Sequence, residues 1–363
     1  MIGKEKSGDN RALSAALFFR ITAPLIKRTL CDSLGRQIRY LRVSVTDRCN
    51  LRCRYCTPSA KFVSLTHDDI ISYEEIARLV RILAPEGIES VRITGGEPLV
   101  RKNPERLLRS LSTIPGIGDI SLTTNGVFLE KAADSLVRAG LSRVNVSLDS
   151  LIPERFSWIT RSGPQTGDGG PRAILRGVEA ARRAGMYPVK INVVLMRRFN
   201  DDELHRFADL TRDHDYEVRF IEFMPLSPKG VWGMESVVPT ADVISSLESA
   251  YGPLVPMDRR KGLGPAVRYQ ISGYAGTIGF ISPVSDHFCD QCNRIRLTAD
   301  GKLLPCLFSD IETDLLGPMR AGASDPEILS LIARILQQKP AGHNIPGGGS
   351  IRGCSRIMSH IGG

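Results

Sequence analysis

The sequence predicts an α/β fold, namely an incomplete, open-sided (β/α)6 barrel of the TIM type with a smaller C-terminal α+β domain that covers it. From residue 38 onward, a short β-rich run, a polar or glycine-containing loop and a helical pattern follow one another six times. Such alternation implies parallel strands joined by right-handed crossovers. Since eight strands close a full barrel, six strands leave one side open. The chain after about residue 230 is the candidate cover.

Six segments have the length and composition of strands. They are residues 39–45, 90–94, 119–124, 143–148, 188–194 and 216–223. Helix signals lie between them. Ser72 and Glu75 have the spacing of a capping box, and Asn103 precedes a proline, as an N-cap residue often does. Gly140 and Gly185 stand where helices commonly end.

Polar residues or glycines stand at the ends of five of the six predicted strands, and in the fifth strand they stand inside it. These positions are 46–49, 94–98, 124–126, 147–149, 190–192 and 222–225. Turn formation alone explains such residues at any single end. In barrels and open α/β sheets, however, ligands bind at the carboxyl ends of the strands. We therefore expect the six loops to face one site.

The loop after the first strand carries Cys49, Cys53 and Cys56 in a C-x3-C-x2-C pattern. A structural zinc site and a conventional 4Fe-4S cluster each take four protein ligands, so three is one too few. Three thiolates can hold a cubane and leave its fourth iron open to a small molecule. The alternative, buried inert thiols, is less consistent with a loop that also contains arginines and an asparagine.

A second set of three cysteines follows a C-x2-C-x13-C pattern, with the members Cys289, Cys292 and Cys306. His287 could complete a structural Cys3His zinc site, and that alternative stays open on spacing alone. Arg294 and Arg296 alternate in a strand-like segment, so they share one face. Paired guanidinium groups bind phosphate oxygens well, which favours an anionic substrate.

The C-terminal part has its own expected elements. Residues 241–251 and 325–338 read as helices, and 266–281 contains strand-like runs interrupted by glycines. Asp300-Gly301 predicts a type I′ hairpin turn. We therefore expect a disordered tail over residues 1–25, the partial barrel with the first cysteine set over 26–230, and the covering domain over 231–363.

Composition excludes several classes of protein. The 363 residues are 42% hydrophobic and 24% charged, so neither a disordered nor a membrane protein is indicated. The formal net charge of +9 suits a polyanionic ligand, and an aromatic content of 6% argues against an extended nucleic-acid surface. Clustered cysteines favour metal binding in a reducing compartment, the cytoplasm.

With Gly95-Gly96-Glu97-Pro98 added to the first cysteine set, the chain resembles the radical S-adenosylmethionine (SAM) enzymes. The second cysteine set, its arginines and the terminal Gly362-Gly363 narrow the resemblance to the GTP 3′,8-cyclase family of molybdenum-cofactor biosynthesis. The similarity runs from about residue 32 to the end of the chain.

The resemblance implies roles for particular residues. Each cysteine set would hold one 4Fe-4S cluster, the first chelating SAM and the second meeting guanine. SAM would lie among Tyr55, Gly95, Gly96, Glu97, Ser147 and Met224. GTP would be held by Arg42, Arg92, Thr123, Lys190, Arg294, Ile295 and Arg296, and the catalytic residues would be Arg294, Arg296, Gly362 and Gly363.

The same resemblance implies a reaction and partners. GTP would be converted by radical chemistry to (8S)-3′,8-cyclo-7,8-dihydroguanosine 5′-triphosphate. An electron donor such as flavodoxin or ferredoxin would be needed, and the product would pass to the cyclic pyranopterin monophosphate synthase. A cytoplasmic monomer or homodimer is expected, without nucleic acid or membrane. The alternatives are a radical enzyme acting on tRNA or a peptide, and a non-catalytic electron carrier or metal-stabilised nucleic-acid module.

Two stretches depart from the family pattern. Arg197-Arg198-Phe199 precedes Asn200 where Arg-Gly is usual, and the loop over residues 162–170 is long and rich in glycine. Neither removes a cysteine or an arginine assigned above.

Overall fold

The computed structural model describes residues 30–56, 64–163, 169–224, 233–258, 264–342, 356 and 358–362. The expected N-terminal tail and Gly363 lie outside these residues, as does most of the loop over 162–170. None of the described helices is long and apolar enough to cross a bilayer.

Six consecutive parallel strands form the centre of the sheet, as predicted. They are β1 (Tyr40–Ser44), β2 (Ser90–Thr94), β3 (Asp119–Thr124), β4 (Arg143–Ser147), β5 (Val189–Leu195) and β6 (Glu217–Glu222). The alternation of strand and helical patterns therefore predicted the centre of the sheet correctly.

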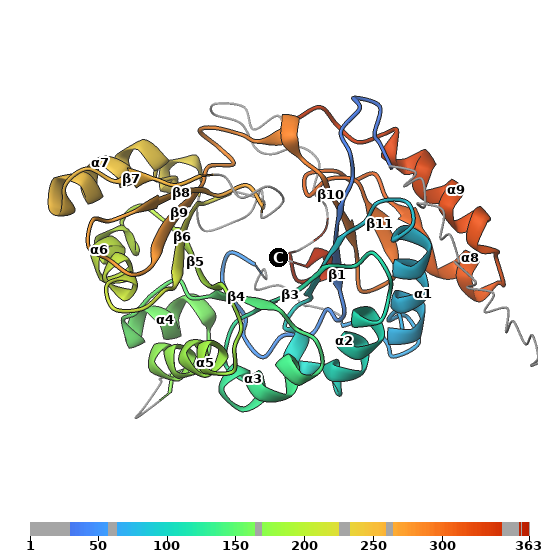
Figure 1. Ribbon diagram of the computed structural model, residues 1–363, viewed down its shortest axis with the longest axis horizontal. Coiled ribbons are helices and arrows are strands. Elements are labelled where there is room, and N and C mark those ends of the chain that lie inside the picture. The colour runs from blue at the N-terminus through green and yellow to red at the C-terminus, as the bar shows by residue number, and fades with distance from the viewer. Residues whose placement is uncertain are drawn as a thin grey trace, which may run out of the picture.

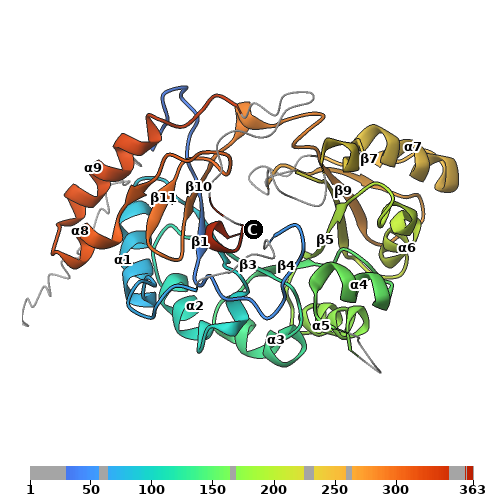
Figure 2. The same cartoon turned by 180° about the vertical axis from the view of Figure 1, so that it is seen from behind.

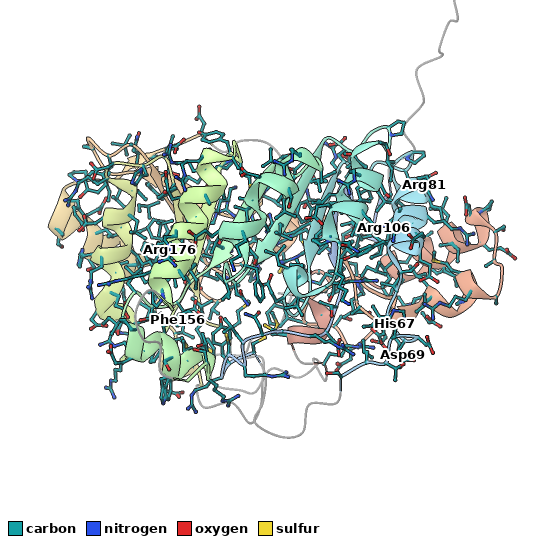
Figure 3. All side chains as sticks on the ribbon, turned by 90° about the horizontal axis from the view of Figure 1, so that it is seen from below. His67, Asp69, Arg81, Arg106, Phe156 and Arg176 are labelled. Carbon is teal, nitrogen blue, oxygen red and sulfur yellow. The ribbon has the colours of Figure 1, made fainter. Side chains whose placement is uncertain are left out.

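Helices cover the outer side of this sheet, which curves into an arc (Figure 1). They are α1 (Tyr73–Leu83), α2 (Pro104–Ser112), α3 (Leu129–Arg138), α4 (Pro153–Thr160), α5 (Pro171–Arg183) and α6 (Leu204–Ala208). Arg81, Arg106 and Arg176 lie on this helical layer in Figure 3. The hydrophobic core lies between the two layers, where Leu41 of β1 is fully buried together with Leu79 of α1.

The C-terminal part extends the sheet at both edges. At one edge β10 (Arg294–Leu297) pairs parallel to β1, and at the other β9 (Thr277–Ile281) pairs parallel to β6. Antiparallel strands follow outside them, namely β11 (Lys302–Leu304) and β12 (Thr313–Asp314) beyond β10, and β8 (Val267–Gln270) and β7 (Val255–Pro256) beyond β9. In the described part of the chain β12 and β7 are the end strands, so the barrel stays open.

The remaining helices complete the outline. They are α7 (Thr240–Tyr251), α8 (Leu316–Arg320), α9 (Asp325–Leu336) and the single turn α10 (Met358–Ile361), with short 3₁₀ segments at Pro98–Val100, Asp201–Glu203, Asp209–Thr211, Met234–Ser236 and Cys289–Gln291. From either side, α10 lies in the middle of the arc (Figures 1 and 2). The chain terminus thus reaches the interior of the open barrel.

One local prediction needs correction. The Ser72–Glu75 capping box is present, and Asn103 is the N-cap of α2 with proline after it, although its backbone is left-handed (φ 56°) and its side chain makes no capping hydrogen bond. The hairpin joining β10 to β11 forms, yet its turn is not type I′, because only Gly301 (φ 72°) has positive φ. The N–H of Gly301 donates to the carbonyl of Thr298 at 3.0 Å, and the glycine takes the left-handed place in a longer loop.

Candidate functional site

The inner face of the sheet is polar. Leu41 and Val43 of β1 point to the helices, so Arg42 between them faces the inside of the arc. In register, Arg42 lies between Arg296 of β10 and Arg92 of β2. A closed barrel normally fills its interior with branched apolar side chains. An interior lined with guanidinium groups is therefore not a packed apolar core, and its charge suits an anionic ligand.

Farther along the sheet, a buried charge cluster joins β5 and β6. Lys190, Glu217 and Arg219 are each less than 5% exposed. The Glu217 carboxylate lies 3.5 Å from Lys190 Nζ and 2.5 Å from Arg219 Nε. Burial, with a further contribution from Arg219, lowers the pKa of Lys190 to about 6, although Glu217 opposes the shift. One carboxylate therefore balances two buried basic groups.

Beside this cluster, Arg143 donates from Nε to Asp119 Oδ1 at 2.6 Å and pairs through a second nitrogen with the other oxygen. Arg92 donates to Ser121 Oγ at 3.3 Å, and burial lowers the pKa of Arg92 to about 10. Arg143, Arg219 and Glu217 were not among the residues predicted from the sequence. Their even spacing along the predicted strands is the signal that would have found them.

A cavity of about 430 Å³ opens against this cluster. Its lining includes Lys190, Glu217 and Arg219 from the sheet, Arg268 from β8, and Phe288 and Arg294 from the second cysteine region. The volume suits a small-molecule ligand. Nearby in the interior, three buried side-chain oxygens lack a hydrogen-bond partner among the described residues, namely Thr123 Oγ1, Asn145 Oδ1 and Asn192 Oδ1. Such atoms call for a ligand or water.

The first cysteine loop packs tightly on the turn after β2. The N–H of Gly96 donates to the Thr46 carbonyl at 2.6 Å, and that of Glu97 to the Arg48 carbonyl at 2.8 Å. A Cβ at Gly96 would lie 2.4 Å from the Arg48 carbonyl oxygen, and one at Gly95 would lie 2.8 Å from the Thr46 oxygen. Glycine is therefore required here by the close approach of two backbones.

The side chain of Glu97 is 1% exposed and already engaged within the protein. Its oxygens accept hydrogen bonds from Thr124 Oγ1 (2.7 Å) and from the N–H groups of Asn125 (2.7 Å) and Leu99 (3.0 Å). Asn125 in turn donates to Asn50 Oδ1 at 2.8 Å and lies 3.8 Å from the Cys49 sulfur. Glu97 thus fixes the loop that contacts the first cysteine set.

The other residues expected at the SAM site lie around the same end of the sheet. Tyr55 donates to Asp149 Oδ2 at 2.7 Å, and Asp149 Oδ1 accepts from the Val194 N–H at 2.9 Å. Ser147 ends β4 half-buried beside Asn192. Asp149 lies at a strand end that we expected to face the site, though without an assigned role, and it ties the cysteine loop to β5.

Downstream of β5, Arg198 occupies the left-handed region (φ 62°), at the position where the resemblance leads us to expect glycine. An arginine there carries a backbone strain of about 1 kcal/mol that glycine avoids. Met224 is half-buried just after β6.

The second cysteine set is held by two basic side chains. Lys339, 4% exposed, donates from Nζ to the carbonyls of Arg294 (2.8 Å) and Pro305 (2.6 Å), and lies 3.6 Å from the Cys292 sulfur. Arg36 donates to the Cys289 carbonyl at 2.7 Å. Burial alone would raise the pKa of Cys292, but Arg294 and Lys339 bring it down to about 7.

The two cysteine sets lie at opposite ends of neighbouring strands. Residues 49–56 follow the carboxyl end of β1, whereas Cys289 and Cys292 precede the amino end of β10, which runs parallel to β1. Cys306 follows β11, which returns antiparallel to that same end. The arginines of β1 and β10 therefore lie between the two sets.

The six cysteines of the two sets are partly buried. Among the described residues, no three His, Cys, Asp or Glu side chains converge on one point as the ligands of a single metal ion do. A cubane distributes its ligands over different irons, so it does not require such convergence. Each end of the polar interior has one set of three thiols, and each set fits one such cluster.

The chain terminus completes the interior. Gly362 is buried, and its carbonyl accepts a hydrogen bond from Arg296 at 3.2 Å. Its φ of 82° and a Cβ position only 2.3 Å from Thr94 Oγ1 exclude a side chain.

Two further residues of β10 were expected at the GTP site. The Arg294 guanidinium carbon lies over the Phe288 ring, 4.9 Å from its centroid. Ile295 packs fully buried in the core, so a ligand contact there is left to its backbone.

Comparison with known proteins gives consistent matches. The Radical SAM superfamily model matches residues 43–211, and the Molybdenum Cofactor Synthesis C model matches residues 216–345. A GTP 3′,8-cyclase of Moorella thermoacetica is 48% identical over 92% of this chain and 99% of its own length. One of Pelotomaculum thermopropionicum is 47% identical with the same coverage.

Solved structures show the likeness of fold. Streptococcus suis SuiB is 14% identical with a TM-score of 0.51, over 76% of this chain and 62% of that one. This chain thus spans about three fifths of SuiB. A SuiB structure bound to SAM gives a TM-score of 0.50. At this identity the match supports the fold alone.

Proposed function

The chain belongs to the GTP 3′,8-cyclase family of radical SAM enzymes, and from this membership we infer that it converts GTP to (8S)-3′,8-cyclo-7,8-dihydroguanosine 5′-triphosphate in molybdenum-cofactor biosynthesis. The observation that carries the inference is the interior of the sheet. Basic side chains of β1, β2, β5 and β10 line it, and a cysteine set lies at each end. A triphosphate between two clusters matches that arrangement.

Cys49, Cys53 and Cys56 would hold one 4Fe-4S cluster, and Cys289, Cys292 and Cys306 the other. When bound, the first cluster and SAM supply the one-electron chemistry that starts hydrogen abstraction. The residues proposed to contact SAM are Tyr55, Gly95, Gly96, Glu97, Ser147 and Met224. Glu97 acts there by holding Asn125, since its carboxylate is occupied by the protein.

The protein's own task is to bind and orient GTP and to exclude water. Arg42, Arg92, Lys190, Arg294 and Arg296 face the triphosphate, with Thr123 and the backbone of Ile295. Arg143 and Arg219 lie near these residues on β4 and β6, each already paired with a carboxylate. Gly362, followed by Gly363, closes the interior beside Arg296.

The test of this function is anaerobic reconstitution of the full chain with iron and sulfide, followed by assay with SAM, a reductant and GTP. We expect about eight irons per chain and 5′-deoxyadenosine formed in step with GTP consumption. Loading of eight irons without GTP consumption or 5′-deoxyadenosine would refute the cyclase function. About four irons and one zinc would instead support the Cys3His site with His287.

The alternative substrates, tRNA or a peptide, require an extended binding surface, whereas the basic side chains here line the interior of the sheet. The same reconstituted protein distinguishes them, because tRNA or peptide would then stimulate SAM cleavage while GTP would not.

The chain also divides near residue 230 into a barrel part, residues 26–230, and a covering part, residues 231–363, that supplies both edge extensions of the sheet.

The partner that supplies electrons is an acidic one-electron carrier such as flavodoxin or ferredoxin. Beside the first cysteine set, Arg52 is exposed, and Arg54 stacks at 4.2 Å on Trp158, which is 42% exposed. Arg161 donates to the Arg52 carbonyl at 3.3 Å and adds a further charge. Positive charge around an exposed aromatic ring suits an acidic protein surface.

Reversing one charge tests this surface. Arg52→Glu should raise the KM for flavodoxin about tenfold at low ionic strength, while the rate with dithionite stays within about twofold. Arg106→Glu, which changes another exposed arginine, on α2, is the control and should leave both unchanged. Equal loss with both reductants would show that Arg52 serves the cysteine loop and not the carrier.

Three further points complete the proposal. The product passes to the cyclic pyranopterin monophosphate synthase. The enzyme works as a monomer or homodimer without nucleic acid or membrane. The six cysteines proposed as cluster ligands suit the reducing cytoplasm.

A further inference from the structure

Four charged side chains form a cluster outside the cationic interior. Arg356 donates from Nε to Glu312 at 2.6 Å and from its terminal nitrogens to both oxygens of Asp300 at 3.1 and 3.2 Å. Lys302 donates to Glu312 at 2.7 Å. Two carboxylates thus face two basic groups, and each member is only 18 to 35% exposed.

The cluster joins segments that are far apart in the sequence. Asp300 lies in the turn between β10 and β11, Lys302 begins β11, and Glu312 directly precedes β12. Arg356 belongs to the C-terminal segment. A network of several half-buried charges holds its geometry better than an isolated surface pair does. Arg356 therefore fixes the C-terminal segment to one edge of the sheet.

Five residues separate Arg356 from Gly362, which lies buried in the interior. Between them α10 forms one turn, Ile361 is fully buried, and the Gly362 N–H donates to the Met358 carbonyl at 3.0 Å. The Gly362 carbonyl then meets Arg296, which lies on β10, the strand whose turn carries Asp300. One hairpin thus holds the segment twice, first through Asp300 and then through Arg296.

We propose that Asp300 and Glu312 clasp Arg356 and thereby position Gly362 against Arg296 in the substrate interior. Arg356 is a positioning residue, because its hydrogen bonds to Asp300 and Glu312 act on the site through Gly362. The clasp deepens the GTP site of the proposed function and rests on it for its catalytic consequence. Its physical consequence, the seating of the terminus, does not depend on which substrate is used.

The first test measures hydrogen exchange of the C-terminal peptide in the anaerobically reconstituted full chain without GTP. Arg356→Gln should speed exchange of the amides of residues 361 and 362 by about tenfold, because the terminus then leaves its seat more often. Exchange in the unmodified protein should also rise as salt screens the clasp, and this rise should be absent in the variant. Arg356→Lys should restore part of the protection.

Arg320→Gln is the matched control. The Nε of Arg320 pairs with a Glu75 carboxylate oxygen at 2.8 Å, and this pair does not involve the C-terminal segment. Arg320→Gln should leave the exchange of residues 361 and 362 unchanged. If Arg356→Gln fails to fold, Glu312→Gln supplies the same measurement. Unchanged exchange in a folded Arg356→Gln or Glu312→Gln protein would overturn the clasp.

The second test separates the clasp from the proposed function. Arg356→Gln should keep its iron content and lower kcat/KM for GTP about tenfold, with Arg356→Lys intermediate. If the unmodified enzyme does not turn over GTP, the proposed function is wrong. The hydrogen-exchange result still shows whether Asp300 and Glu312 hold Arg356 and position Gly362. If Arg356→Gln turns over GTP normally, the clasp has no catalytic role and the proposed function stands.

Discussion

Replacing Gly96 by alanine is expected to prevent the first cysteine loop from holding its cluster. The new Cβ would lie 2.4 and 2.6 Å from the carbonyl oxygen and carbon of Arg48, and 2.7 Å from the oxygen of Asp47. All three are backbone atoms, so no side chain can move aside. Overpacking of this kind costs about 3 kcal/mol, and here the strain falls on the loop that leads into Cys49.

The measurement is iron content after anaerobic reconstitution, together with urea unfolding and 5′-deoxyadenosine formation. We expect Gly96→Ala to load about half of the wild-type iron, since the second set is unaffected, and to form no 5′-deoxyadenosine. Gly118→Ala is the control, because a Cβ at Gly118 meets nothing within 4 Å and its φ is not positive. Full loading and normal stability of Gly96→Ala would contradict the close approach described here.

Glu217→Gln is expected to destabilise the ligand-free protein and to make its stability depend strongly on GTP. Glu217 is the carboxylate that balances Lys190 and Arg219, all nearly fully buried. Removing one partner from a buried charge cluster costs about 3 kcal/mol, because the remaining charge is left uncompensated. A triphosphate in the adjoining cavity would supply the missing negative charge.

Thermal unfolding with and without GTP tests this expectation. The stabilisation by saturating GTP should be larger in Glu217→Gln than in the unmodified protein, and Lys190 should be neutral over a wider pH range, since Glu217 raises its pKa. Glu130→Gln is the control, because Glu130 pairs with Arg176 at 3.2 Å with both side chains 45% exposed. A loss in Glu217→Gln no larger than in this control would contradict a shared, buried charge balance.

Much of the site followed from local patterns. The three-cysteine loop, the Gly-Gly-Glu-Pro turn and the pair of arginines on β10 are each made of residues that are close in the sequence. Each could therefore be recognised from local spacing. The resemblance to the family, and not alternation, assigned Arg42 and Lys190 to GTP, and the strands carrying them formed as expected. Arg143, Arg219 and Glu217 obeyed the same alternation but carried no motif.

The sequence by itself determined the six central strands, the two cysteine sets and the polar character of the strand ends, because hydrophobic period and turn chemistry are local. Only the tertiary structure decided that β9 and β10 extend the sheet at opposite edges. It likewise decided that Glu217 balances two basic residues and that Arg356 is held by Asp300 and Glu312. These are pairings between distant segments, and their energies depend on burial and charge balance, which exist only once the chain has folded.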